Sequence, residues 1–302
     1  MWIELRVATA FPEFAEEVLL AHGAVSVTLV DAADSPVLEP APGATPLWPQ
    51  TATCGLFDAQ ADLDAVAAAL RELLPDGAQL GLSRKTVSDD DWIGAWRQHA
   101  RPLRFGAADA RGLWICPSGH AVDEAGAAVV QLDPGLAFGT GSHPSTALCL
   151  DWLAQHPPAG AQVLDYGCGS GILAIAALKL GAAHAQAVDI DPQALTACLG
   201  NAQVNGVADR IACAAAAQFD EQAVDETVDL VLANILARPL IELAPRLSRC
   251  LRRGGDIVLA GVMQSQSAQV RAAYAPWFDL RDDAVRDDWV RIWGRRNGAR
   301  AG

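Results

Sequence analysis

The chain has 302 residues, of which 51% are hydrophobic and 19% are charged, and its formal net charge is −14. A chain of this size buries roughly three-quarters of the surface that its unfolded form exposes. The composition is therefore that of an ordinary folded protein, in one large domain or two modest ones, and it excludes an intrinsically disordered chain. The acidic balance disfavours a basic nucleic-acid-binding protein, so no direct contact with nucleic acid is expected.

The seven cysteines are scattered along the chain, and none forms a CxxC pair. This spacing excludes a zinc ribbon or a thioredoxin-type motif and favours reduced, buried thiols without a metal site. The first residues read Met-Trp-Ile-Glu-Leu-Arg, which lack the basic and apolar segments of a signal peptide. No run of 18 apolar residues is present, so we expect a cytoplasmic protein that does not enter a membrane.

The first 87 residues alternate between strand-like and helix-like patterns. Ile3, Leu5 and Val7 point to one side of residues 2–7, which predicts a half-buried strand. Further strands are predicted at 25–29, 51–57 and 78–87, with amphipathic helices around 11–19 and 63–74. The order β-α-β-β-α-β is that of a small α+β ferredoxin-like domain. Nothing in it resembles a catalytic motif, so its expected role is binding or structure.

Residues 88–99 predict a helix between two domains. Acidic residues stand at its start, where they favour the positive end of the helix dipole, and Trp92 and Trp96 share one face. We therefore expect a domain over residues 1–87, a linker with a helix over 88–111, and a second domain over 112–302.

The second domain alternates short apolar strands with helices. Strands are predicted at 163–165, 186–189, 230–233, 257–260, 277–281 and 288–294, and helices at 171–180, 192–204 and 237–251. Apolar strands separated by helices indicate an α/β, doubly wound fold, in which helices cover both faces of a parallel sheet.

The central motif is a glycine-rich turn between a strand and a helix. Residues 163–171 read Val-Leu-Asp-Tyr-Gly-Cys-Gly-Ser-Gly. Glycines let the backbone approach a ligand closely, and a helix start supplies free N–H donors. Asp189 ends the next strand, 22 residues after Gly167, where a carboxylate can accept both ribose hydroxyl protons. The pattern predicts a site for a nucleotide-like cofactor.

The glycine spacing separates two classes of cofactor. A dinucleotide fingerprint counted from Gly167 requires glycine at position 172, where the chain has Ile172. The observed spacing, Asp165-x-Gly-x-Gly-x-Gly, resembles motif I of class I S-adenosylmethionine-dependent methyltransferases. The resemblance implies S-adenosyl-L-methionine as the cofactor and a seven-stranded, Rossmann-like sheet.

Three further stretches carry a narrower resemblance. Residues 132–146 read Leu-Asp-Pro-Gly-Leu-Ala-Phe-Gly-Thr-Gly-Ser-His-Pro-Ser-Thr, residues 234–240 read Asn-Ile-Leu-Ala-Arg-Pro-Leu, and residues 114–118 read Trp-Ile-Cys-Pro-Ser. With the tryptophan linker, they closely resemble the PrmA family of ribosomal protein methyltransferases, from Trp2 to about Trp293.

This resemblance implies a substrate and a division of labour. The expected substrate is large-subunit ribosomal protein eleven, free or ribosome-associated, methylated on lysine ε-amino groups and on its N-terminal α-amino group. The first domain is expected to recognise the substrate and the second to bind S-adenosyl-L-methionine. The matching motifs place Thr146, Gly167, Asp189 and Asn234 at the cofactor.

The chain departs from the family pattern at a few positions. Ser142 and Ser145 stand where threonines are common, and Arg238 stands where a small residue is usual. The serines keep the hydroxyl group, so they leave the cofactor assignment intact, whereas Arg238 lies at the expected rim of the acceptor site.

Each predicted site residue also has a structural interpretation. Asp189, Asn234 and Thr146 are residue types that begin helices, although Asp191 is the better cap for the helix at 192–204. His143 precedes a proline, which favours a structural role over a catalytic one. No residue of the motifs is forced into the role of general base, so we assign none.

Three other functions remain open at this point. The first is a methyltransferase with another acceptor, such as RNA or a small molecule, and the acidic charge weighs against RNA. A nicotinamide oxidoreductase is opposed by Ile172. A binding protein with a vestigial site is opposed by the intact glycines, Asp189 and Asn234.

Overall fold

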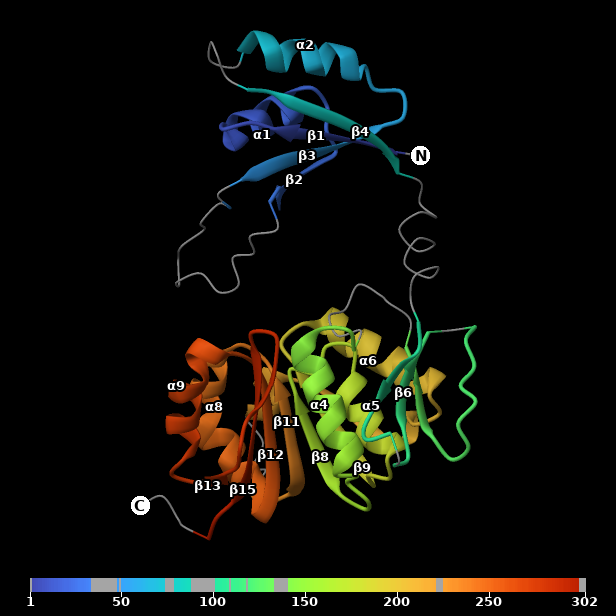
Figure 1. Cartoon of the computed structure of the whole chain (residues 1–302), viewed down its shortest axis with the longest axis vertical. Coiled ribbons are helices and arrows are strands. Elements are labelled where there is room, and N and C mark those ends of the chain that lie inside the picture. Colours follow the sequence, from blue (N-terminus) through green and yellow to red (C-terminus); the bar gives the residue numbers. More distant parts are fainter. Residues whose placement is uncertain are drawn as a thin grey trace. The chain divides into compact units, whose positions relative to one another are not determined.

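The computed structural model describes residues 2–33, 48, 50–73, 79–87, 101–108, 110–117, 119–132, 141–220 and 225–298. The chain divides into two compact units, Met1–His99 and Ala100–Gly302, each shown in Figure 1 and each taken by itself below. The predicted linker helix, with Trp92 and Trp96, lies outside the described residues.

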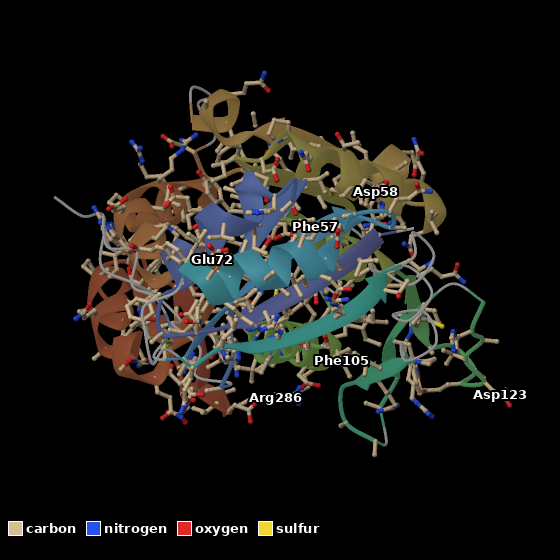
Figure 2. The ribbon with its side chains drawn as sticks, turned by 90° about the horizontal axis from the view of Figure 1, so that it is seen from above. Phe57, Asp58, Glu72, Phe105, Asp123 and Arg286 are labelled. Atoms are coloured by element: carbon tan, nitrogen blue, oxygen red, sulfur yellow. The ribbon has the colours of Figure 1, made fainter. Side chains whose placement is uncertain are left out.

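In the described residues, the N-terminal unit is a four-stranded antiparallel sheet with two helices. Its elements are β1 (Trp2–Ala8), α1 (Pro12–Ala21), β2 (Ser26–Asp31), β3 (Thr51–Asp58), α2 (Leu63–Leu73) and β4 (Gly81–Val87), and the strand order is β2-β3-β1-β4. All six elements expected in this half are present. Leu5 and Val7 of β1 join Phe57 of β3, labelled in Figure 2, and apolar residues of both helices in one core. Both helices therefore cover the same face of the sheet.

Local signals explain where these helices begin. α1 starts at Pro12, whose missing N–H is no loss in the first turn of a helix. The carboxylate of Asp62 accepts hydrogen bonds from the backbone N–H groups of Asp64 and Ala65, at 3.1 and 3.0 Å. This is the N-cap arrangement that satisfies donors at a helix start.

The C-terminal unit begins with a three-stranded sheet, β5 (Leu103–Phe105), β6 (Leu113–Cys116) and β7 (Ala128–Gln131). Strand β5 lies within the range expected to be a linker. It forms a strand because it pairs with β6 and because the side chain of Phe105 is buried in the main core of this unit. The second unit therefore starts earlier in the chain than residue 112.

The main sheet has eight strands, one more than expected. The order is β10-β9-β8-β11-β12-β15-β13, and β14 pairs with β15. Its strands are β8 (Gln162–Tyr166), β9 (His184–Asp189), β10 (Ile211–Ala215), β11 (Val228–Asn234), β12 (Leu251–Met263), β13 (Phe278–Leu280), β14 (Ala284–Arg286) and β15 (Trp289–Arg296). The extra strand arises because β14 turns tightly into β15 through Asp287, which has a φ of 53°.

Helices cover both faces of this sheet. They are α4 (Pro144–Gln155), α5 (Ile172–Lys179), α6 (Pro192–Val204), α7 (Ala216–Asp220), α8 (Ala237–Cys250) and α9 (Ser267–Tyr274). In β11, Leu230 and Leu232 belong to a core with α4, α5 and α6, whereas Val231 and Ala233 belong to a core with α7, α8 and α9. Figure 1 shows α4 and α5 lying over one face. Because helices bury both faces of the sheet, its strands consist of continuous apolar residues and do not alternate between apolar and polar ones.

Two expectations from composition can be compared with these elements. All seven cysteines lie within the described residues, each is a free thiol, and all but the half-buried Cys213 are buried. No helix in the described part of the chain is long and apolar enough to cross a membrane.

Candidate functional site

The predicted site residues gather where the strand order of the main sheet reverses. β8 lies between β9 and β11, and all three are parallel, so their carboxyl ends share one edge. In open α/β sheets, ligands bind in the crevice at such a reversal. Gly167 follows β8, Asp189 is the last residue of β9, and Asn234 is the last residue of β11. We call this the carboxyl edge.

Thr146 reaches the same place from the first turn of α4. The Nδ2 atom of Asn234 donates a hydrogen bond of 3.0 Å to the hydroxyl oxygen of Thr146. Thr146 is 1% exposed, so its hydroxyl holds the amide of Asn234 and does not face open solvent. That Thr146 itself contacts the cofactor stays a prediction.

The glycine turn has no room for side chains. Gly167 and Gly171 have φ values of 79° and 78°, in the left-handed region that favours glycine. A Cβ on Gly167 would collide with Cγ2 of Ile235, and a Cβ on Gly171 would collide with Sγ of Cys198. The backbone therefore lies directly under Ile235 and against α6.

The turn uses its N–H groups for hydrogen bonds within the protein. Gly167 and Cys168 both donate to the carbonyl oxygen of Val188, at 2.7 and 3.0 Å, and Gly171 donates to the carbonyl of Cys168 at 2.8 Å. These groups are engaged within the protein because the turn binds back onto β9, whereas the free donors were expected at the start of the helix, which begins at Ile172. These three N–H groups are therefore not available to a ligand.

The carboxylate of Asp189 stands beside this turn. Its Oδ2 accepts from the N–H of Gly169 at 2.9 Å, and its Oδ1 accepts from the N–H of Asp191 at 3.0 Å. Each carboxylate oxygen accepts more than one hydrogen bond, so both can also receive ribose hydroxyl protons. Asp191 caps α6 through the N–H of Gln193 at 2.8 Å, which confirms it as the capping residue.

The sequence analysis missed Ile190, although a signal was present. This isoleucine stands between two aspartates at a strand end, and it is 85% exposed. A large apolar side chain in open solvent beside a ribose-type carboxylate is suited to contact the flat base of a nucleoside.

Asp165 lies beneath the turn and is buried. Its Oδ2 accepts a hydrogen bond of 3.0 Å from the N–H of Ala174 in α5, and its Oδ1 has no partner within the described residues. Burial, aided by the negative charge of Asp189, raises the pKa of Asp165 to about 7, although the bond from Ala174 opposes the shift. This carboxyl group joins β8 to α5.

A second close approach fixes the Asn-Ile segment. A Cβ on Gly261 of β12 would lie 2.8 Å from the carbonyl carbon of Ile235. Glycine at this position therefore lets β12 pack against the backbone that follows Asn234. The signal for it was an Ala-Gly pair at the end of the predicted strand 257–260.

His143 has a structural role at the start of α4. Its Nδ1 accepts from the backbone N–H of Ser145 at 3.3 Å and lies 2.8 Å from the Ser145 hydroxyl. Its ring packs edge-on against Trp289, with centroids 4.8 Å apart, and burial lowers its pKa. These contacts favour the helix cap over a general base. Residues 133–140 of the family motif, with Phe138, lie outside the described residues.

The profile of the ribosomal protein L11 methyltransferase (PrmA) family matches residues 1–297. The chain belongs to this family. Ribosomal protein L11 methyltransferases of Pseudomonas putida (strain GB-1) and Methylococcus capsulatus are 50% and 48% identical to it over 299 and 303 residues. Each alignment covers 98% of this chain and 99% of the relative. The chain is thus a methyltransferase of the PrmA family, as the motifs predicted.

A solved structure supports the same assignment. The ribosomal protein L11 methylase of Lactobacillus delbrueckii subsp. bulgaricus has a TM-score of 0.56 and 34% identity to this chain. The match covers 61% of this chain and 95% of the other. Within the ranges that the structure describes, no group of three or more His, Cys, Asp or Glu residues is arranged to hold a metal.

Proposed function

We propose that this chain transfers methyl groups from S-adenosyl-L-methionine to lysine ε-amino groups and the N-terminal α-amino group of ribosomal protein L11, in the cytoplasm. One observation carries the proposal. Gly167, Asp189 and Asn234 stand at the carboxyl ends of three adjacent parallel strands, so a glycine turn, a carboxylate and an amide that can orient an amine share one edge. The names of the PrmA relatives supply the acceptor.

The residues of the carboxyl edge fit the proposed cofactor. Asp189 would bind the ribose hydroxyls, and the exposed side chain of Ile190 would contact the adenine ring. The backbone at Gly167, beside the side chain of Ile235, would receive the amino-acid portion of the cofactor. When bound, the cofactor supplies an activated methyl group on a sulfonium.

In methyl transfer, the main contribution of the protein is to align the attacking amine with the methyl group. In an in-line displacement, the lone pair of a neutral amine forms the N–C bond as the S–C bond breaks, so positioning is the main contribution. A free lysine has a pKa of about 10.4, so a proton must leave before transfer, and desolvation favours the neutral form. The side-chain oxygen of Asn234, whose Nδ2 is held by Thr146, is placed to accept a hydrogen bond from the attacking amine.

The N-terminal unit is proposed to be a ferredoxin-like domain that recognises the substrate. The order β2-β3-β1-β4, with two helices on one face, supports this fold, and among the described residues of this unit no helix packs on the opposite face of the sheet. The residues of the carboxyl edge all come from the C-terminal unit, so recognition is the role left to the N-terminal one.

The direct test is methyl transfer with purified components. S-adenosyl-L-methionine carrying a labelled methyl group is incubated with the chain and with L11, or with ribosomal RNA as the competing acceptor. Label in L11 that is strongly reduced with the Asp189→Asn variant at low cofactor concentration supports the proposal. Label found only in the RNA would contradict the proposal that L11 is the methyl acceptor.

A further inference from the structure

The C-terminal unit contains a cavity of about 860 Å³ that is separate from the carboxyl edge. One wall is a stripe along the second half of α4, with Asp151, Trp152 and Gln155. The other wall is one face of β15, formed by the alternate residues Arg291, Trp293 and Arg295. Trp152 comes six residues after Thr146, about 9 Å further along the helix, so the cavity does not share the site described above.

An unpartnered positive charge lines this cavity. The Nε and Nη1 atoms of Arg291 are buried and have no hydrogen-bond partner among the described residues, and the same holds for Nε1 of Trp152. Nearly all buried polar groups in proteins have a partner, and burying an unpaired charge is costly. Burial also lowers the pKa of Arg291, although the negative charge of Asp283 opposes the shift.

Two acidic side chains line the cavity. Asp282 is exposed and has no ion pair within the described residues, whereas Asp151 is engaged. Asp151 pairs with Arg286, labelled in Figure 2, at 3.1 Å. Asp256 pairs with Arg295 at 3.3 Å and accepts from the indole N–H of Trp293 at 3.1 Å.

Asp283, whose negative charge acts on Arg291, is engaged as well. It accepts from Arg271 at 2.6 Å and from the hydroxyl of Ser267 at 2.9 Å. No hydrogen bond or ion pair joins Asp283 to Arg291 within the described residues. Among the described residues, Arg291 therefore has no ion pair, although the chain as a whole is acidic.

We propose that this cavity is a binding site for an oxyanion of the phosphate class, with the guanidinium of Arg291 as its fixed positive charge. Guanidinium groups match phosphate oxygens in charge and in planar geometry. Arg281, exposed at the rim and without an ion pair among the described residues, supplies a second positive charge.

The lining also offers aromatic rings beside these charges. The ring of His156 stacks on Trp152 with centroids 4.7 Å apart and lies 4.8 Å from that of Trp293. His156 is exposed, so a flat ring attached to the phosphate has an aromatic surface to contact. The phosphate can therefore be free or part of a nucleotide, and the two sources are distinguished by experiment.

The test is isothermal titration of the full chain in a buffer free of phosphate and sulfate. The probes are inorganic phosphate, uridine monophosphate and uridine. A uridine nucleotide is used because the carboxyl edge is proposed to bind an adenosyl group. We expect saturable binding of a phosphate-bearing probe but not of uridine. Equal affinity for inorganic phosphate and uridine monophosphate would show that the cavity binds a free oxyanion. Tighter binding of uridine monophosphate would show that the cavity binds a nucleotide.

Variants locate the binding. Arg291→Gln should weaken it at least tenfold, Arg291→Lys should retain most of it, and Arg249→Gln, an exposed arginine outside the cavity, should leave it unchanged. In anion-free buffer, Arg291→Gln should melt no lower than the parent chain, because it removes an unpaired buried charge. If Arg291→Gln does not fold, Arg281→Gln at the rim decides, with a several-fold loss expected. Absence of binding by the parent chain, or equal binding by the cavity variants, overturns the proposal.

Discussion

Asn234 and Thr146 are 88 positions apart in the chain, yet their side chains meet at 3.0 Å. The bond joins the end of β11 to the first turn of α4 and leaves the side-chain oxygen of Asn234 available to another donor. Asp189 is held in a similar way, by the N–H groups of Gly169 and Asp191. Both polar groups are thus held in place by the protein before any ligand arrives.

Asp189→Asn is expected to weaken S-adenosyl-L-methionine binding by about 1.5–3 kcal/mol, the range for hydrogen bonds to a charged group. Asp191→Asn is the matched control. It removes a charge two residues away but keeps a good helix cap, so affinity should be nearly unchanged. Calorimetric titration of both folded variants measures the difference. Equal affinities for the two would remove Asp189 from the cofactor site.

Asn234→Ala should lower the single-turnover rate at saturating cofactor by about tenfold or more, with a smaller loss of cofactor affinity. An interaction that forms mainly in the transition state lowers kcat without weakening ground-state binding. Thr146→Val is the companion variant, because it removes the hydroxyl that holds Asn234 but leaves the amide itself. If Asn234→Ala turns over normally, holding Thr146 is the whole role of this side chain.

At the scale of elements, the strand ends were predictable and their surroundings were not. Asp189 and Asn234 follow apolar runs, which locate carboxyl ends in any parallel sheet. Strand β10 was not predicted, because Ile-Ala-Cys-Ala-Ala consists mostly of small residues without alternation. The strand β12 begins six residues before the predicted 257–260, because its first half contains a Gly-Gly pair that is more typical of a turn.

Contacts between distant segments account for the remaining differences. Two N–H groups of the glycine turn bind the carbonyl of Val188 on the neighbouring strand, a contact that the sequence analysis did not predict. The helix α4 was not predicted either. It is buried on most sides, so its apolar residues do not form the single stripe by which an amphipathic helix is recognised. Both features depend on which strand or helix lies alongside, and a pattern within one segment does not contain that information.

The buried carboxyl group of Asp165, which joins β8 to α5, should make the free energy of unfolding depend on pH. The pKa of Asp165 is raised from its ordinary value of 3.8 to about 7, mainly by burial, so the folded state holds this proton over a range where the unfolded state has lost it. Stability therefore falls as pH rises between about 4 and 7, by about 1.4 kcal/mol per pH unit from this one group.

Asp165→Asn should remove that contribution. Urea unfolding at several pH values is expected to give the variant a flatter decline than the parent chain between pH 4 and 7. Asp209→Asn, at an exposed carboxyl group, serves as the control and should follow the parent chain. Identical slopes for the parent chain and Asp165→Asn would show that Asp165 is already ionised when folded.

At the scale of the whole molecule, the two units have separate cores. One apolar cluster lies entirely within residues 3–82, and the other two lie entirely within residues 103–293. Each unit therefore has the buried apolar surface needed to fold as a domain. The residues proposed to bind the cofactor all lie in the second unit, which leaves the first for contact with the protein substrate.

A chain that begins at Ala100 should fold and bind S-adenosyl-L-methionine with nearly the affinity of the full chain, because the carboxyl edge is complete in the second unit. It should lose methylation of L11, because the proposed recognition domain is absent. Calorimetry and a methyl-transfer assay measure the two properties on the same preparation. Full methylation by the shortened chain would show that the N-terminal unit is not the recognition domain.

Intact-mass spectrometry of L11 tests the central proposal most directly. Purified L11 is incubated with the full chain and S-adenosyl-L-methionine, and the product is then fragmented to locate the added groups. The account predicts mass increases in whole methyl units, placed on lysine ε-amino groups and the N-terminal amine, and none with the Asp189→Asn variant at low cofactor concentration. Unmodified L11 after incubation with a chain that binds the cofactor would contradict it.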